Sequence, residues 1–193
     1  MDRTALRTFI QRVHPMTEER LAAILERFTP WAVGVGEELL TVGRVNDDYV
    51  FLCMGWMRSY THDTRGDEVT TAFHGPGRVV FDIDSFFERT PSKEGITALT
   101  PCTGLRLDFA ALNELFHAQP EFREFGRRVL VKHSVALKRR MFSLINETAE
   151  QRYDALVHDE PALLQHAPLK HIATYLGVTD TSLSRIRKEW ARK

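Results

Sequence analysis

The end of the chain holds the feature that most limits its fold, a pair of amphipathic segments separated by one glycine. In LKHIATYLGVTDTSLSRIRKEWARK, apolar residues recur at helical spacing on both sides of Gly177. The first stripe consists of Leu169, Ile172, Ala173 and Leu176, and the second of Leu183, Ile186 and Trp190. Because residues at this spacing share one face of a helix, we expect two short helices, each with its stripe buried.

The residues between the two stripes favour a tight turn. Gly177 can adopt a left-handed conformation without a Cβ penalty, and Thr179 is a good N-cap for the second helix. The small Ala173 lets the helices approach, while Val178 adds an apolar side chain to the corner. Together they predict a helix-turn-helix, because an ordinary helical hairpin does not need Ala and Gly at these two places.

The polar surface of the second helix can contact nucleic acid. Arg185 can hold a guanine edge through two hydrogen bonds, while Arg187 and Lys188 suit phosphate. Asp180 can accept from a cytosine amino group or cap the helix. The expected DNA-binding residues are Thr179, Asp180, Thr181, Ser182, Ser184, Arg185, Arg187 and Lys188.

The distribution of charge supports this interpretation, although the whole chain is neutral with 26 Lys and Arg residues against 26 Asp and Glu residues. Residues 168–193 hold six of the basic and two of the acidic residues, a net charge of +4, which leaves −4 on the rest. A cationic end on an acidic body is typical of a protein that binds nucleic acid with one face. A solvated basic tail would carry the same charge but would not need the helical spacing.

The body of the chain predicts helices, then strands, then helices again. An amphipathic opening helix and a second one near residues 17–28 come first. Short segments rich in β-branched and aromatic residues follow, with glycines between them, and GITALT and CTGLRLD complete an antiparallel roll or barrel. A short helix then begins with Asp108 as its N-cap, and a long helix runs from Pro120 to about Asn146.

We therefore predict an α+β fold in three parts: a β-roll sensor domain (1–118), a connecting helix (119–147) and a winged-helix-like helix-turn-helix domain (148–193). Residues 146–150 are expected to be the hinge. The long helix has too many apolar residues for one narrow stripe, which favours a dimer seam in addition to packing on the roll. Packing within one chain alone remains the alternative.

Other features limit the class of protein. The sequence has no run of about 18 apolar residues and no apolar leader, so we expect a cytoplasmic protein without a membrane partner. Cys53 and Cys102 lie in predicted strands and are expected to be small buried side chains rather than a disulfide or metal pair. His62 and His74 stand alone, whereas a metal oxygenase on a β-roll needs a close His-x-His pair and a carboxylate. We expect neither a metal nor a catalytic site.

A glycine-punctuated roll, a long helix and a C-terminal helix-turn-helix together resemble the Crp/Fnr family of bacterial transcription regulators, and its short members in particular. The resemblance is carried by VGVGEELLTVGRVNDDYVFLCMGWMRSY, HGPGRVVFDIDSFF and HIATYLGVTDTSLSRIRKEW. It implies a cyclic-nucleotide-binding-like roll (a double-stranded β-helix), a homodimer, double-stranded DNA as a partner and RNA polymerase as a further one. It also implies that an effector at the roll controls DNA binding.

The chain departs from that family at the ligand site. Family members that bind cyclic AMP hold its ribose with a Gly-Glu pair and its phosphate with an Arg-Ser pair. Asp82 and Ile83 fill the first place here, and Lys93 and Glu94 the second. Because a carboxylate repels a cyclic phosphate, we do not expect the usual cyclic AMP motif to bind the ligand. No cofactor is assigned, and a cyclic nucleotide stays open as the alternative. The expected effector pocket consists of Phe81, Asp82, Ile83, Asp84, Ser85, Lys93 and Glu94.

The resemblance bears on other sensor and partner classes as well. The family's DNA-reading Arg-Glu pair is replaced by Asp180 and Thr181, and only Arg185 matches its third contact, so a different target sequence is expected. The first 52 residues lack cysteine, which argues against an iron–sulfur sensor. A haem sensor needs a His or Cys axial ligand, for which His62, His74, Cys53 or Cys102 could nominally serve, but a lone His in such a turn is more often exposed or satisfied within the core. The alternative function is a ligand-binding or protein-interaction module whose helix-turn-helix no longer reads DNA.

Overall fold

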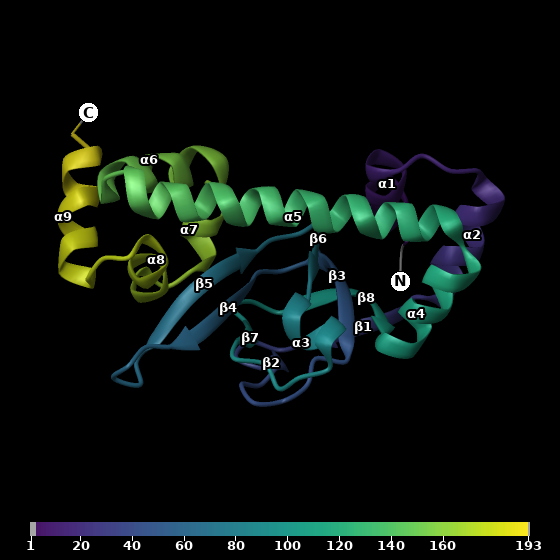
Figure 1. Cartoon of the computed structure of the whole chain (residues 1–193). Coiled ribbons are helices and arrows are strands. Elements are labelled where there is room, and N and C mark those ends of the chain that lie inside the picture. Colours follow the sequence, from purple (N-terminus) through teal and green to yellow (C-terminus); the bar gives the residue numbers. More distant parts are fainter. Residues whose placement is uncertain (1–2, 193) are drawn as a thin grey trace.

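A computed structural model describes residues 3–192 of the protein and contains a roll of two four-stranded antiparallel sheets (Figure 1). In spatial order the first sheet consists of β1 (Thr29–Val33), β8 (Cys102–Asp108), β3 (Asp48–Met54) and β6 (Arg78–Val80). The second consists of β2 (Glu38–Leu40), β7 (Gly95–Ala98), β4 (Met57–His62) and β5 (Glu68–His74). The predicted antiparallel roll is confirmed.

Apolar side chains fill the interior of the roll. Leu52, Met57, Val80 and Ile96 are fully buried there. Gly95 is required by close packing, because a Cβ at this position would lie 2.4 Å from Cζ of Tyr60. The roll is therefore a packed core rather than an empty barrel.

Helices cover the first sheet. α1 (Thr4–Val13), α2 (Glu18–Arg27), α3 (Ile83–Glu88) and α4 (Phe109–Ala118) contribute to one apolar cluster with β3 and β8. The Asp108 carboxylate accepts a hydrogen bond from the N–H of Ala111 at 2.7 Å, which confirms the predicted N-cap of α4. The sequence did not predict α3, a short helix in the segment that was expected to bind the effector.

A single long helix, α5 (Pro120–Asn146), crosses the whole molecule above the roll (Figure 1). Its 27 residues confirm the predicted bounds. Phe122 and Phe125 are buried against the other helices, whereas the part of α5 from Val131 onward exposes large apolar side chains. These are Val131, Val135, Leu137, Met141, Phe142, Leu144 and Ile145. Packing within the chain therefore leaves much of the apolar surface of α5 from Val131 onward uncovered.

The chain after α5 forms α6 (Ala149–Asp159), α7 (Leu163–His166), α8 (Leu169–Leu176) and α9 (Asp180–Trp190). The expected hinge at residues 146–150 is shorter than predicted, because the Thr148 hydroxyl caps α6 and leaves two residues between α5 and α6. From Phe109 to Arg192 the structure contains helices but no strand, so this part has the helices of the expected winged-helix form without a wing. Within residues 3–192, no helix combines the length and apolar content that a membrane crossing needs.

Candidate nucleic-acid interface and effector pocket

The turn between α8 and α9 has the predicted geometry. Gly177 adopts a φ of 71° and its N–H donates to the carbonyl of Thr174 at 3.1 Å. The Thr179 hydroxyl accepts from the N–H of Ser182 at 3.3 Å and caps α9. Because a left-handed glycine ends one helix and a threonine begins the next, the two helices are joined by only a few residues.

Most of the predicted apolar stripes are buried between these helices. Ile172, Ala173, Leu176, Leu183 and Ile186 form a common core with residues of α6 and α7. The prediction is wrong for Leu169 and Trp190, each of which is 40% exposed.

The two exceptions lie at the outer ends of the helix pair. Leu169 is the first residue of α8 and extends beyond the contact with α9. Trp190 lies in the last turn of α9, where its indole N–H donates to the Asp154 carboxylate at 2.9 Å and its ring packs edge-on against Tyr153. An indole with one apolar and one polar side suits such a half-covered position.

The outer surface of α9 presents the side chains that were expected to bind DNA. All eight except Ser182 are exposed, and α9 lies at one end of the molecule (Figure 1). Ser182 is half-buried because its hydroxyl accepts from the Thr179 hydroxyl at 3.0 Å. Within residues 3–192, Arg185, Arg187 and Lys188 form no ion pair with a carboxylate. Their charges are therefore available to an external anion.

The opposite side of α8 contacts the roll and α5. The Thr174 hydroxyl accepts from the N–H of Thr70 on β5 at 3.1 Å. The guanidinium of Arg140 on α5 lies 3.5 Å from the ring centroid of Tyr175 and donates to its carbonyl. The last carbonyl of α8, that of Leu176, accepts from Arg152 on α6 at 2.8 Å. These contacts hold the helix pair against the body of the protein.

The predicted effector residues lie on the loop before α3, on the first turn of α3 itself (Ile83, Asp84 and Ser85) and on the loop before β7. Asp82 ends the first loop, and its carboxylate accepts from the Ser92 hydroxyl at 2.5 Å. The same hydroxyl accepts from the N–H of Glu94 at 2.9 Å, so Ser92 joins the two loops. Ser85 is buried and donates to the carbonyl of Thr90 at 2.6 Å. Its hydroxyl is therefore not directed toward a ligand.

Not all predicted pocket residues come together. Phe81 and Ile83 are half-buried beside Asp82, whereas Asp84 and Lys93 are exposed. The backbone carbonyl of Lys93 accepts from the Thr61 hydroxyl at 3.0 Å, which fixes the loop but brings no positive charge to Asp82 and Glu94. The charged groups that come together where the two loops meet are therefore the carboxylates of Asp82 and Glu94.

The charge of this pocket does not fit a cyclic phosphate. Burial raises the pKa of Glu94, and the neighbouring Asp82 carboxylate raises it further. The nearby Arg89 is already engaged, since it forms an ion pair with Asp47 and donates to the carbonyl of Asn46. A phosphate here would meet the carboxylates of Asp82 and Glu94, and the guanidinium of Arg89 is already paired, so the residues present do not fit a cyclic nucleotide held through its phosphate.

Sequence reasoning missed Asn46 and Ser92, which are only 1% and 4% exposed. The side-chain oxygen of Asn46 accepts from the N–H of Asp82 at 2.7 Å, and the backbone N–H of Asn46 donates to the Ser85 hydroxyl at 2.9 Å. Both residues form direct hydrogen bonds to Asp82, which lies in another segment of the chain. A single polar residue in a loop leaves no periodic signal from which such a bond could be predicted. Only the contact across 36 positions of the chain reveals the role of Asn46.

The cysteines and histidines lie in ordinary packing environments. Cys102 on β8 is buried as expected, and burial raises its pKa, whereas Cys53 on β3 is only half-buried. The Nε2 atom of His74 lies 2.8 Å from the Ser59 hydroxyl, whereas His62 is exposed. Among the residues that the structure describes, no three His, Cys, Asp or Glu side chains gather as they would around a metal ion.

Residues 32–119 match the family model of the cyclic nucleotide-binding domain. This match begins at the end of β1 and covers β2 to β8 together with α3 and α4, so that part of the chain has the cyclic nucleotide-binding fold. A comparison with curated protein sequences finds no significant match.

Solved structures share the fold over more than the roll. CLP of Xanthomonas campestris, described as a c-di-GMP responsive global regulator, is 15% identical with a TM-score of 0.71, over 91% of this chain and 92% of that one. FixK2 of Bradyrhizobium japonicum is 17% identical with a TM-score of 0.72, over 86% and 85%. The catabolite activator protein of Thermus thermophilus is 17% identical with a TM-score of 0.58, over 95% and 87%. At these identities the likeness establishes the fold alone.

Proposed function

We propose that the protein is a sequence-specific DNA-binding transcription regulator of the Crp/Fnr type. In this proposal residues 1–118 form the sensor, residues 119–147 the connecting helix and residues 148–193 a helix-turn-helix domain. Helix α9 enters the major groove, and Arg185 reads a base edge while Arg187 and Lys188 contact phosphates. No catalytic step is assigned to the protein.

One observation supports the proposal more than any other, namely the contrast between the two faces of α9. Leu183 and Ile186 bind it to α8, while Arg185, Arg187 and Lys188 lie exposed and free of carboxylate partners within residues 3–192. Unpaired arginines on an exposed helix that follows a tight turn are the groups that a major groove accommodates. A helix that served only to pack a bundle would not need them.

The proposal includes a homodimer that forms through α5. From Val131 onward, α5 exposes Val131, Leu137, Phe142 and Ile145, and so much apolar surface is costly to leave in water. Pairing of two α5 helices would bury this face and place the two copies of α9 on the same side of the dimer. Two-fold symmetry then requires a pseudo-palindromic target with half-sites about 34 Å apart.

Enrichment of random DNA duplexes on the purified full chain tests the proposal. We expect a pseudo-palindrome to be enriched, and its affinity to fall steeply with salt because phosphate contacts release counterions. The absence of an enriched sequence at low salt, with or without added nucleotides, would contradict DNA reading. It would instead favour the protein-interaction module, whose affinity for a partner would depend only weakly on salt.

A further inference from the structure

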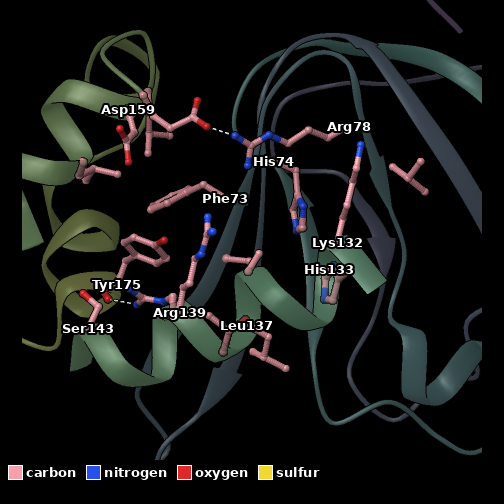
Figure 2. A pocket seen from close by; sticks show the side chains of 18 of the residues that line it. Phe73, His74, Arg78, Lys132, His133, Leu137, Arg139, Ser143, Asp159 and Tyr175 are labelled. Atoms are coloured by element: carbon pink, nitrogen blue, oxygen red, sulfur yellow. Dashed lines mark hydrogen bonds and ion pairs between the residues drawn. The ribbon is translucent and has the colours of Figure 1, made fainter. Parts of the chain in front are cut away.

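One arginine of the roll is almost completely buried on the face of the second sheet that meets the helices after α5. Arg58 on β4 is 4% exposed. The preceding residue, Met57, packs in the roll interior, and successive residues of a strand point to opposite faces, so Arg58 points out of the roll. Its cross-strand neighbour Phe73 packs there against Tyr175 of α8, with ring centroids 5.1 Å apart (Figure 2). Arg58 therefore lies where the roll and the helix pair of α8 and α9 meet.

The partners of Arg58 come mainly from the neighbouring strand β5. Arg58 forms an ion pair with Glu68 and donates to the Thr70 hydroxyl at 3.3 Å. Its guanidinium also lies 4.6 Å from the ring centroid of Tyr60, whereas its Nε atom has no hydrogen-bond partner within residues 3–192. Because removing a guanidinium from water is costly even when it is paired, such a residue contributes little net stability. A role in fixing the position of its neighbours explains its burial better.

Thr70 connects Arg58 to α8. The Thr70 hydroxyl, which accepts from Arg58, lies 3.3 Å from the Thr174 hydroxyl, and the Thr70 N–H donates to the same Thr174 hydroxyl at 3.1 Å. Burial and the charge of Arg58 lower the pKa of His171, so the guanidinium also lies close to α8 itself. Arg58, Thr70 and Thr174 therefore form one polar group that extends from β4 across β5 to α8.

The apolar contacts at this interface do not by themselves fix the angle of the helices. Trp56 and Phe73 of the roll share an apolar cluster with residues of α6 to α9. Apolar attraction is non-directional, whereas a hydrogen bond forms only within a narrow range of distance and angle. Because β5 is an edge strand, the N–H of Thr70 can bond to α8 instead of to another strand. The polar group therefore defines the direction of α8 more closely than the apolar cluster does.

We propose that Arg58 is a positioning residue for DNA reading, which holds the Thr70 hydroxyl in place so that Thr70 and Thr174 set the angle of α8 and α9 on the roll. Arg58 acts through α8, since it is buried and does not reach the surface of α9. The inference deepens the proposed function and rests on it, because the angle of α9 matters for reading only when two copies must reach half-sites about 34 Å apart. A helix pair that can tilt on the roll accepts half-sites at more than one spacing.

Hydrogen exchange of the full chain, followed for single amides by NMR, tests the contact without DNA. The reporter is the Thr70 amide, whose partner is on α8. We expect Arg58→Met to speed its exchange at least about tenfold, while the buried amides of β3 and β8 keep their rates. A general loss of stability would speed all of these amides. Arg65→Met, which removes an exposed arginine from the turn of the same hairpin, is the matched control and should change none of them.

Thr70→Val tests whether Arg58 acts through the Thr70 hydroxyl. Valine keeps the backbone N–H and nearly the shape of threonine but loses the hydroxyl that accepts from Arg58. We expect the protection factor of the amide at position 70 to fall in this variant as well. Adding Arg58→Met to Thr70→Val should then cause no further fall, because the two residues act as one unit. Fully additive effects would overturn the inference.

The spacing of half-sites tests the consequence for DNA reading. The duplexes carry the enriched half-sites at the enriched spacing or at a spacing changed by one or two base pairs. We expect the natural protein to prefer the enriched spacing at least about tenfold and Arg58→Met to lose most of this preference. The affinity for a duplex with a single half-site should stay unchanged, since the surface of α9 is intact. A spacing preference that Arg58→Met leaves unchanged, or that the natural protein lacks, would overturn the inference.

The two proposals can fail separately. Sequence-specific DNA binding, with the Thr70 exchange rate and the spacing preference unchanged in Arg58→Met, would overturn this inference and leave the proposed function intact. Faster exchange at Thr70 in a protein that enriches no DNA would overturn the proposed function and the role of Arg58 in reading, and would leave only the contact between Arg58 and α8.

Discussion

The hydroxyl of Thr174 on α8 accepts a hydrogen bond from the backbone N–H of Thr70 on β5, although 104 positions separate the two residues in the chain. The bond joins the helix that we propose to support α9 to the edge strand of the roll. Together with the ion pair between Arg78 and Glu160, it fixes how the helix pair lies on the roll. A movement of the helix pair relative to the roll would therefore have to break these two contacts.

Thr174→Val tests the contact between the roll and α8. Valine has nearly the shape of threonine but cannot accept the hydrogen bond, so the Thr70 N–H loses its partner at a half-buried position. We expect the free energy of unfolding, measured with urea, to fall by about 1–2 kcal/mol. Thr181→Val, which changes an exposed threonine on α9, is the matched control and should change stability by less than about 0.5 kcal/mol. Equal effects of the two variants would contradict the contact.

Local signals explain why much of the fold could be predicted from the sequence. Pro120 begins α5, Asp108 caps α4 and Gly177 ends α8, and each of these residues acts within one turn of its own position. The alternation of short β segments with glycines also sufficed to predict the roll. Such signals need no knowledge of the rest of the chain.

Features that depend on distant contacts could not be predicted. The aromatic packing of Phe86 against Phe109 holds α3 in place, and no periodic pattern indicates it. Ser92 reaches the Asp82 carboxylate only because the fold brings two loops together. For the same reason no sequence pattern indicated that Asn46 holds the loop at Asp82 from 36 positions away.

Gly177→Ala tests the turn between α8 and α9. The added Cβ would meet nothing closer than Leu144, at 3.8 Å, so the cost arises from the φ of 71° rather than from a clash. We expect a loss of about 1–2 kcal/mol in the free energy of unfolding. Gly34→Ala is the control, because its φ is not left-handed and its nearest neighbour is the flexible Glu37 side chain at 3.6 Å. A Gly177 variant as stable as the control would contradict the importance of the turn.

Ile145→Gln tests the proposed dimer. Ile145 is 68% exposed in the single chain, so the substitution should leave the fold of the monomer intact. In a dimer formed through α5 it removes apolar contact from both copies, and we expect the dissociation constant to rise at least about tenfold. Sedimentation equilibrium measures this change. Met54→Gln, at an apolar residue of β3 that is 64% exposed, should not alter association.

Arg185→Ala tests base reading by α9. The substitution should weaken binding to the enriched sequence by about 1–3 kcal/mol while the dimer stays intact. Arg65→Ala removes an exposed arginine from the turn between β4 and β5 and should leave DNA affinity unchanged. Undiminished affinity in the Arg185 variant, measured by fluorescence anisotropy at fixed salt, would exclude the proposed docking of α9.

Two histidines should make the protein less stable in mild acid. Burial, with the charges of Arg78 and His133, lowers the pKa of His74 to about 4, and burial lowers the pKa of His171 to about 4 as well. Because the same groups titrate near pH 6.5 in the unfolded chain, the unfolded state binds more protons between pH 6.5 and 4. Their contribution to stability is complete above pH 6.5 and is lost as the pH falls to 4.

His74→Gln should remove one of these two protons. We expect the fall in the free energy of unfolding between pH 6.5 and 4.5 to become shallower but not to vanish, since His171 remains. Each histidine contributes a slope of at most about 1.4 kcal/mol per pH unit. Urea titrations at several pH values measure the slope, with the exposed His62→Gln as the control. A slope in the His74 variant as steep as in the control would mean that His74 takes up its proton without cost to the fold.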